Sequence, residues 1–210
     1  MIPRTIILAD GSYPEHEIPL EYLRSAERII CCDGSAEKLI DEGIIPEAIV
    51  GDIDTLPQRI VTRFPDRVIR IAEQETNDLT KAVTWCIKQG YADLVILGAT
   101  GKREDHTIGN ISLLAEYARN ASVLMVTDTG ILRPLPESST VDSFPGQQVS
   151  VFSVDPATEI TSEGLKYPLK NRRLESWWSG TLNEAIAERF TLSFNGGPLI
   201  VYLEFPGHGS

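Results

Sequence analysis

Short apolar runs alternate with helical patterns over the first 128 residues, and this alternation constrains the fold more than any other feature of the sequence. The runs are rich in β-branched residues, which is typical of buried strands. Two of the helical patterns end at Gly43 and Gly90, and glycine suits the position after a helix C-terminus. Alternation of this kind predicts a mainly parallel sheet with helices on both faces. The expected strands are Thr5–Ala9, Arg28–Cys32, Ala48–Val50, Val68–Ala72, Leu94–Leu97 and Ser122–Val126, and the expected helices are Ser35–Glu42, Asp78–Gln89 and Thr107–Arg119.

The pattern changes near Gly130, where helical periodicity ends and turn-forming residues multiply. Strand-like segments follow, and Thr191–Phe194 and Leu199–Leu203 are predicted to form a β-hairpin across the sequence Asn-Gly-Gly-Pro. We therefore expect an α/β chain of two domains. A mainly parallel, Rossmann-like α/β domain would cover residues 1–129, and a small antiparallel β-sandwich would cover residues 130–210. The expected strands of the second domain are Gln148–Val154, Glu159–Thr161, Phe190–Phe194 and Leu199–Phe205.

The charge balance argues against several classes of partner. The 210 residues include 19 basic and 30 acidic side chains, a net charge of −11, which is unsuited to nucleic acid or to an anionic membrane. The apolar run before Asp10 is too short for a secretion signal or a membrane span. Three cysteines are too few and wrongly spaced for a disulfide framework or a zinc site, so we expect buried free thiols. These features indicate a cytoplasmic protein.

Acidic side chains stand where the expected strands end. Asp33 follows one strand, and Asp52 and Asp54 follow the next one, two residues apart. In an extended chain such a pair shares a face and can reach one ion. The carboxyl ends of parallel strands form the rim at which α/β proteins bind ligands, and clustered carboxylates there favour a hard cation such as Mg²⁺. The alternative for each segment alone is a plain turn, because Gly and Asp are common in turns.

A second acidic segment opens the helix expected from Asp78. Either Asn77 or Asp78 suits the helix N-cap, and Lys81 follows one turn later on the same side. Capping alone would explain the acid. Lys81 is then either a solvated partner of Asp78 or a phosphate contact.

A third segment combines a glycine loop, two cations and the acid Asp105. The loop is not a Walker A motif, because only two residues separate Gly98 from Gly101 and because Arg103 follows the lysine. Arg103 suits bidentate phosphate binding, although a surface loop charge is an equal alternative. Asp105 stands at a helix start, and His106 is interpreted as a hydrogen-bonding or packing residue rather than a general base.

Two adjacent tryptophans, Trp177 and Trp178, lie in a polar stretch of the second domain. An aromatic face can hold a flat or cationic heterocycle. Packing in the core or at an interface is the alternative for either one.

Taken together, the acidic and aromatic segments resemble the thiamine pyrophosphokinase (thiamine diphosphokinase) family. They occur in the family's order and span the chain from Asp33 to Glu184. The family's Gly-Asp-Phe-Asp-Ser stands here as Gly-Asp-Ile-Asp-Thr. The matching stretches are Asp33-Gly34, Pro46–Thr55, Glu73–Ala82, Arg103–Ile111, Gly164–Leu169 and Gly180–Glu184.

The resemblance implies an ATP-binding α/β domain, a β-sandwich and a homodimer with thiamine bound at the subunit interface. It also implies roles for individual residues. Asp52, Asp54, Asp78 and Asp105 would hold Mg²⁺ and the triphosphate. Gln74 and Arg103 would lie near the transferring phosphates, and Asp33 near the nucleotide. The remaining candidates for ligand binding are Lys81, His106 and Asn110, with Trp177, Trp178 and Asn183 on the thiamine side.

The reaction implied is ATP plus thiamine giving AMP plus thiamine diphosphate. Phosphoryl chemistry depends on in-line positioning and charge neutralisation, so a strong general base is not required. Two alternatives remain. A Mg²⁺-dependent nucleotide hydrolase would use water as the acceptor, and a non-catalytic module would bind the nucleotide or thiamine without turnover.

Overall fold

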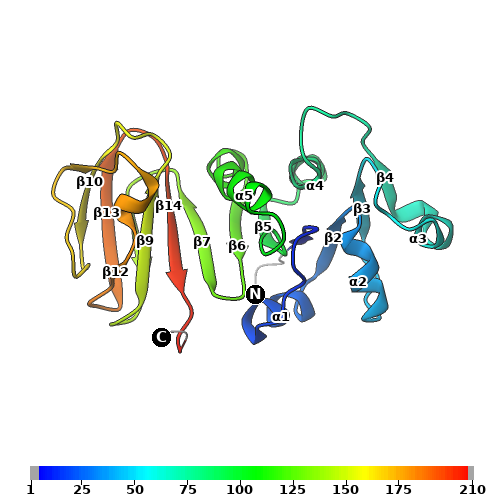
Figure 1. The fold of residues 1–210 in the computed structure, drawn as a ribbon, viewed down its shortest axis with the longest axis horizontal. Helices are drawn as coiled ribbons and strands as arrows, with labels where there is room; N and C mark the ends of the chain where they lie inside the picture. The colour runs from blue at the N-terminus through cyan, green and yellow to red at the C-terminus, as the bar shows by residue number, and fades with distance from the viewer. Residues whose placement is uncertain (1–4, 208–210) are drawn as a thin grey trace. The chain divides into compact units, whose positions relative to one another are not determined.

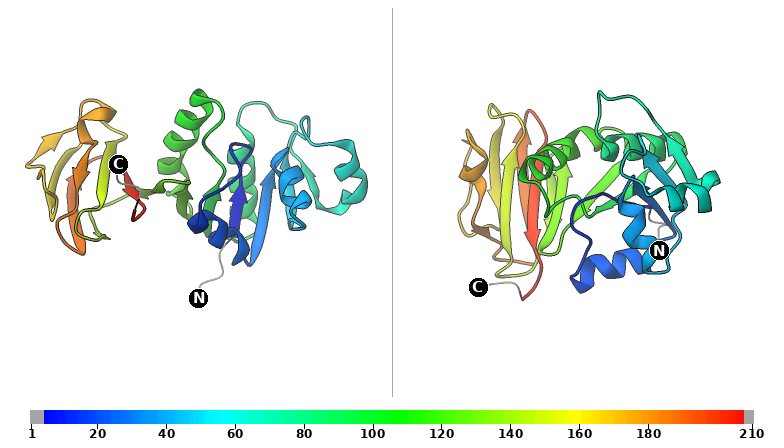
Figure 2. Two further views of the ribbon diagram at one scale, coloured as in Figure 1. Left: turned by 60° about the horizontal axis from the view of Figure 1, so that its bottom comes forward. Right: turned by 45° about the vertical axis from the view of Figure 1, so that its right-hand side comes forward.

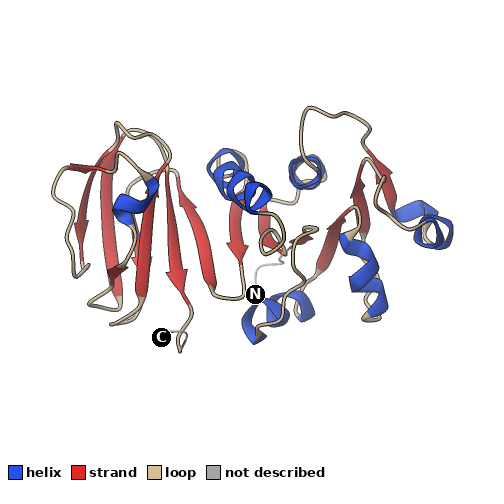
Figure 3. Ribbon diagram, in the orientation of Figure 1, coloured by secondary structure: helices blue, strands red, loops and turns tan. Residues whose placement is uncertain are grey.

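The computed structural model describes residues 5–207, and it divides into two compact units. The first unit runs to Leu113 and takes in Asn120–Asp128. The second comprises Leu114–Arg119 and the chain from Thr129 onward. Figure 3 shows the helices concentrated in the first unit and the strands dominating the second.

The first unit alternates strands and helices, as the periodicity predicts (Figure 1). Several bounds shift by one to three residues, and α5 begins at Glu104 rather than Thr107, so Asp105 lies in its first turn. Two short helices, α1 and α3, were not among the expected elements. The elements are β1 (Thr5–Leu8), α1 (Glu17–Arg24), β2 (Arg28–Cys32), α2 (Ser35–Asp41), β3 (Ala48–Gly51), α3 (Gln58–Arg63), the 3₁₀ helix η1 (Pro65–Arg67), β4 (Val68–Arg70), α4 (Asp78–Lys88), β5 (Asp93–Leu97), α5 (Glu104–Tyr117) and β6 (Ser122–Val126).

The strands of the first unit form a parallel sheet in the order β6-β5-β1-β2-β3-β4. Ile6 of β1, for example, lies opposite Ile29 of β2 and Val95 of β5. All four residues of β1 are buried, and because successive side chains point to opposite faces, both faces of the sheet are covered there. The order proceeds one way from β1 to β4 and the other way from β5 to β6, so β1 and β5 flank a topological switch point.

Helix α4 shows how local sequence places the site. The Asn77 side chain accepts a hydrogen bond from the Thr80 N–H at 2.9 Å, which caps the helix N-terminus. Gly90, with φ of 83°, follows the last turn in the left-handed conformation that glycine adopts at little cost. The apolar face of α4 packs on the sheet, which fixes the depth at which Asp78 begins the helix. Its buried residues are Leu79, Lys81, Ala82, Val83 and Cys86.

The second unit consists of two antiparallel sheets, ordered β12-β9-β14-β7 and β11-β10-β13-β8. Residues of both sheets enter one core, in which Phe190 is the largest fully buried side chain. Val151 and Val201, partners on neighbouring strands of one sheet, belong to the same core. The two layers are visible in Figure 2. The elements are β7 (Gly130–Leu135), β8 (Ser139–Asp142), β9 (Gln148–Ser153), β10 (Glu159–Glu163), β11 (Arg172–Arg173), the 3₁₀ helix η2 (Trp177–Gly180), β12 (Asn183–Glu184), β13 (Arg189–Asn195) and β14 (Leu199–Glu204).

The predicted hairpin between Thr191–Phe194 and Leu199–Leu203 is wrong. β13 pairs with β10 and β8, whereas β14 pairs with β7 and β9, so the turn carries the chain from one sheet to the other. Gly197 donates its N–H to Thr158 Oγ1 at 3.0 Å, and Val154 donates to the Pro198 carbonyl. These contacts with the β9–β10 connection take the place of pairing across the turn.

The fold class predicted from the sequence, a mainly parallel α/β part followed by antiparallel β-structure, is confirmed. The three cysteines are buried free thiols, as expected. Burial raises the pKa of Cys31 to about 12, so its thiol stays protonated and unreactive. Within residues 5–207, no helix is both long enough and apolar enough to cross a membrane.

Candidate active site

The loops after β1 and β5 border a cavity of about 370 Å³ beside the switch point. Residues at the strand ends and at the starts of α4 and α5 line it, among them Asp10, Asp33, Asp78, Lys102, Arg103, His106 and Asn110. Gly11 donates its N–H to the Gly98 carbonyl at 2.6 Å, which ties the two loops together. The cavity therefore lies where open α/β sheets bind ligands.

Three carboxylates converge next to this cavity, and of the three only Asp33 lines it. One oxygen from each of Asp33, Asp52 and Asp54 can be chosen so that all three lie within 4.8 Å of one another. The backbone reaches this arrangement through a turn rather than an extended segment, because Ile53 has φ of 69° and the Asp54 N–H bonds Asp52 Oδ1 at 3.3 Å. The extended-chain argument for Asp52 and Asp54 was therefore wrong in its geometry, although the two side chains do meet. A β-branched residue rarely adopts this conformation, and such strain clusters at functional sites.

Asp33 is the buried member of the trio, with 2% of its surface exposed. Its Oδ2 accepts a hydrogen bond from the Thr55 N–H at 3.3 Å, and its Oδ1 is buried without a hydrogen-bond partner in the described part of the chain. Burial is the main reason that the pKa of this carboxyl is raised. The hydrogen bonds from Thr55 lower it, and the negative charges of Asp78 and Asp54 raise it further. A buried carboxylate oxygen without a partner is costly unless a donor or a cation compensates it, so Asp33 is a candidate cation ligand.

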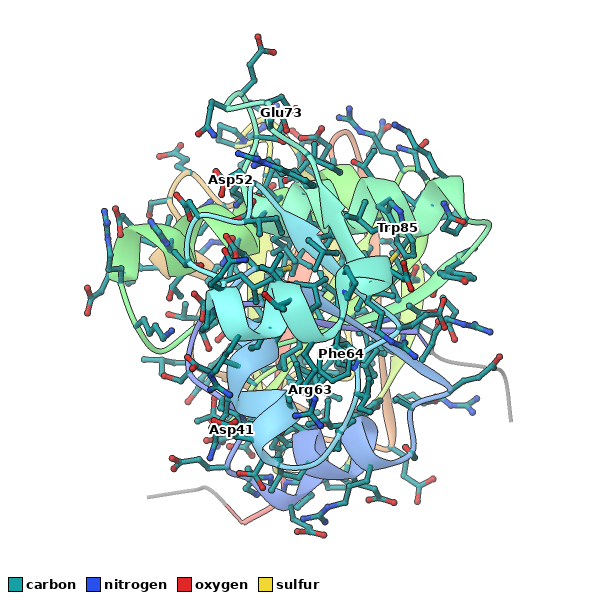
Figure 4. All side chains as sticks on the ribbon, turned by 90° about the vertical axis from the view of Figure 1, so that its right-hand side faces the viewer. Asp41, Asp52, Arg63, Phe64, Glu73 and Trp85 are labelled. Atoms are coloured by element: carbon teal, nitrogen blue, oxygen red, sulfur yellow. The ribbon has the colours of Figure 1, made fainter. Side chains whose placement is uncertain are left out.

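The charge of Asp52, unlike that of Asp33, is compensated by a hydrogen-bond donor and a nearby cation. Gln74 Nε2 donates to its Oδ2 at 3.0 Å, and Lys81 Nζ lies 3.9 Å from the same oxygen. The Gln74 hydrogen bond is the chief reason that the pKa of Asp52 is lowered, and the Asp54 N–H and Lys81 assist. Figure 4 shows Asp52 beneath the loop that carries Glu73, at the opposite end of the first unit from Asp41.

Lys81 is buried and bonds Asp78 Oδ1 at 2.9 Å. Burial by itself would lower its pKa, but the hydrogen bond and charge of Asp78, with Asp52 and Glu73, outweigh it and raise the pKa. Of the two alternatives drawn from the sequence, a solvated partner is therefore excluded. Lys81 is a permanent cation that holds two of the carboxylates in position.

Gly51 allows these groups to approach one another. A Cβ placed on it would lie 3.0 Å from the Asp33 Cβ and 3.2 Å from Asp78 Oδ1. A side chain here would require one of the two acids to shift by a few tenths of an ångström, so glycine at the end of β3 permits their close approach.

The two loop cations are each paired with an acid. Lys102 Nζ lies 2.9 Å from Asp10 Oδ1, and Arg103 forms a bidentate pair with Asp105 at 3.1 and 2.6 Å. Hydrogen bonding to Arg103 lowers the pKa of Asp105. These pairs are exposed, so an incoming polyanion can compete for the cations at small cost. Asp105 does not belong to the carboxylate trio, and neither does Asp78, although Asp78 lines the cavity.

The side-chain amide of Asn110 is held at both ends by hydrogen bonds to other residues of the protein. Its Oδ1 accepts from Asn77 Nδ2 at 3.1 Å, and its Nδ2 donates to the Ala99 carbonyl at 2.9 Å. His106 lines the cavity from the first turn of α5.

Of the three candidate residues of the second unit, Trp177 and Asn183 contact other residues of the unit, whereas Trp178 is largely exposed. Trp177 packs on Phe152 with ring centroids 5.8 Å apart, whereas Trp178 is 77% exposed. Asn183 is buried, and its side chain bonds both the N–H and the carbonyl of Tyr167, which commits it to holding that loop. Trp178 is thus the more exposed of the two tryptophans.

Family models cover most of the chain. Residues 20–140 match the model described as "Thiamin pyrophosphokinase, catalytic domain", and residues 130–202 match "Thiamin pyrophosphokinase, substrate-binding domain". The chain belongs to the thiamin pyrophosphokinase family. Thiamine pyrophosphokinase from Bacillus subtilis is 31% identical to it, over 80% of this chain and 83% of that protein. Thiamin pyrophosphokinase 1 from Caenorhabditis elegans is 26% identical, over 70% of this chain and 66% of the relative.

Solved structures of family members share the fold. The thiamin pyrophosphokinase of Geobacillus thermodenitrificans superposes with a TM-score of 0.79 at 28% identity and covers 98% of this chain and 99% of its own. The Bacillus subtilis structure gives 0.80 at 27% identity and covers 97% and 99%. The family resemblance noted in the sequence is thereby confirmed, together with a kinase-type transferase function that forms thiamine diphosphate.

Sequence reasoning passed over two contributors to this region. Asp10 was noted only as the end of an apolar run, although it occupies the same strand-end position as Asp33 and pairs with Lys102. Thr55 was quoted only as part of a motif, and its contact with Asp33, 22 residues away, required the fold. A search for acidic residues at the ends of the expected strands would have found Asp10 but not Thr55.

We predict that Gly51→Ala destabilises the protein by about 1–3 kcal/mol, because the new methyl group meets Asp33 and Asp78. Gly109→Ala is the matched control, since a Cβ there meets nothing within 4 Å, and it should stabilise α5 by about 0.5–1 kcal/mol. Urea unfolding of both variants measures the difference. Equal stabilities for the two would contradict the close approach at Gly51.

Proposed function

We propose that this protein uses its carboxylate edge to bind a Mg²⁺–ATP complex and transfers the pyrophosphoryl group of ATP to the hydroxyl of thiamine. The hydroxyl oxygen bonds the β-phosphorus, and the bond from that phosphorus to the oxygen of the α-phosphate breaks. AMP leaves with that oxygen, and the hydroxyl proton passes to solvent. The products are thiamine diphosphate and AMP. The observation that carries the proposal is the trio Asp33, Asp52 and Asp54 beside the switch-point cavity.

The donor set suits a hard divalent cation. All three trio members offer carboxylate oxygens, and the Asp33 Oδ1 has no hydrogen-bond partner to displace among the described residues. Asp33, Asp52 and Asp54 would hold Mg²⁺, with Asp78 and Asp105 as the further candidates implied by the family. The ion would neutralise phosphate charge.

The remaining polar residues position the reactants. Gln74 and Lys81 hold Asp52 in place, and Lys81 also holds Asp78. Lys102 and Arg103 would exchange their aspartate partners for phosphate oxygens when the nucleotide enters. His106 lines the same cavity on the nucleotide side, and Asn110 lines it with both ends of its amide bonded to the protein.

The aromatic segment of the second unit would supply the thiamine side. Trp178 would stack on the heterocycle, Trp177 would support it through Phe152, and Asn183 would hold the neighbouring Tyr167 loop. In this proposal residues 1–129 form the catalytic domain and residues 130–210 the thiamine-binding domain. The protein works in the cytoplasm as a homodimer whose active sites lie at the subunit interface.

The experiment that tests this function is AMP release from Mg²⁺–ATP with and without thiamine. The transferase produces AMP only when thiamine is present, in equal amount with thiamine diphosphate. Thiamine-independent AMP release would favour the nucleotide hydrolase, and binding of both ligands without AMP would favour the non-catalytic module. The exposed Trp178 favours the transferase, because a hydrolase needs no heterocycle platform.

Asp52→Asn and Asp54→Asn are each predicted to lower turnover by at least about 100-fold, because each removes a charge from the cation site. Circular dichroism should show that both variants keep the fold. Asp41→Asn is the control. This acid is the last residue of α2 and lies away from Asp52 in Figure 4, so its loss should leave turnover unchanged. Full activity of the first two variants in EDTA would exclude the metal site.

Trp178→Ala should raise the KM for thiamine by about 2- to 30-fold through loss of stacking and cation–π attraction, and leave the KM for ATP nearly unchanged. Trp177→Ala provides the comparison. It should lower thermal stability through loss of the Phe152 contact and affect the thiamine KM less. If neither substitution alters the thiamine KM, the two tryptophans serve packing alone.

A further inference from the structure

We propose that Asn77 and Asn110 form a positioning pair that sets the spacing between the two sides of the nucleotide site. On one side is the start of α4, with Asp78 and Lys81. On the other is the loop after β5, with Lys102 and Arg103. The inference rests on the proposed function, and it assigns these amides to the alignment of the reaction rather than to ligand contact.

Three hydrogen bonds in series connect the two sides. The Thr80 N–H donates to Asn77 Oδ1 at 2.9 Å, and Asn77 Nδ2 donates to Asn110 Oδ1 at 3.1 Å. Asn110 Nδ2 then donates to the Ala99 carbonyl at 2.9 Å. Residues 33 positions apart are thus joined through side chains alone, and Asn77, Asn110 and Ala99 all border the cavity.

Both ends of the series are backbone groups, and they fix its direction. The Thr80 N–H can only donate, so the amide oxygen of Asn77 must face it and the amide nitrogen must face Asn110. The Ala99 carbonyl can only accept, so the nitrogen of Asn110 must face it. Each position therefore requires an acceptor and a donor on two different atoms of one short side chain. Asparagine provides them, whereas a serine or threonine hydroxyl has both functions on a single oxygen that lies closer to the backbone. An aspartate at residue 77 would keep the helix cap but could not donate to Asn110.

The series contributes position more than stability. Asn77 is exposed and Asn110 is half-buried, so solvent competes for both amides. What the series does constrain is the separation of Asp78, the carboxylate at the start of α4, from the cations after β5. Phosphoryl transfer depends on that separation, since a displacement of about 1 Å can cost about 100-fold in rate.

The test compares Asn77→Ser, Asn77→Asp and Asn110→Ala with wild type. Serine and aspartate both cap helices, so each replacement at residue 77 preserves the cap. Aspartate has no donor for Asn110, and the serine hydroxyl, closer to the backbone and engaged in the cap, does not reach Asn110 Oδ1 as Asn77 Nδ2 does. We expect kcat to fall by about 10-fold or more in all three, with KM for thiamine within about 2-fold and the melting temperature of the Asn77 variants within about 3 °C. The double variant Asn77→Ser/Asn110→Ala should be no slower than the slower single variant, because the pair acts as a unit.

Asn120→Ala is the matched control, because this asparagine lies exposed in the turn after α5 and should leave every parameter unchanged. If Asn77→Asp equals or exceeds wild type, the residue is only a cap and the proposal is wrong. A raised KM for ATP with unchanged kcat would show direct nucleotide contact and would also overturn it.

A readout without turnover separates this inference from the proposed function. The side-chain NH₂ signals of Asn110 in ¹⁵N spectra should shift on Asn77→Ser and stay in place on Asn120→Ala. If wild type makes no thiamine diphosphate but these signals shift, the link exists and the proposed function fails. Unmoved signals in an active enzyme would overturn the positioning pair alone.

Discussion

Repulsion among carboxylates at the ends of parallel strands is the constraint on which the rest of this structure depends. The chain carries a net charge of −11, yet the fold brings Asp33, Asp52 and Asp54 together and places Asp78 against Gly51. Close like charges oppose the compact state unless donors or cations compensate them. The protein compensates them unequally. Asp52 receives Gln74 and Lys81 and has a lowered pKa, while Asp33 is buried with one oxygen unpartnered in the described structure and has a raised pKa.

The difference between the compensated Asp52 and the uncompensated Asp33 explains why the site suits a cation bound together with a polyanion. Lys81 is buried with the acids and neutralises part of their charge permanently, whereas Lys102 and Arg103 are exposed and paired only with surface aspartates. The buried cation therefore maintains the site, and the exposed cations are available to phosphate. A divalent ion at the trio would complete the neutralisation and favour the triphosphate in a protein of otherwise repulsive charge.

Much of the first unit was predictable because its strands are short, buried on both faces and separated by amphipathic helices. β2 and β6 match the expected bounds at both ends, and α4 ends one residue early. The hairpin failed because a turn sequence specifies a reversal of the chain but not which strands become neighbours. Asp52 and Asp54 do meet, but not through the extended segment from which their approach was predicted, since the left-handed Ile53 replaces it. The Thr55–Asp33 contact and the Asn77–Asn110 bond join residues more than 20 positions apart, and no local pattern signals them.

Thermal melting of wild type and Asp33→Asn, each in EDTA and in excess Mg²⁺, tests the central claim most directly. Mg²⁺ should raise the melting temperature of wild type, because an ion that binds only the folded state stabilises it. Asp33→Asn should melt at or above wild type in EDTA, since it removes a buried charge and asparagine tolerates the positive φ of 40° at this position. It should gain little from Mg²⁺. An equal Mg²⁺ shift in both proteins, or none in wild type, would contradict the claim that these carboxylates form a cation site.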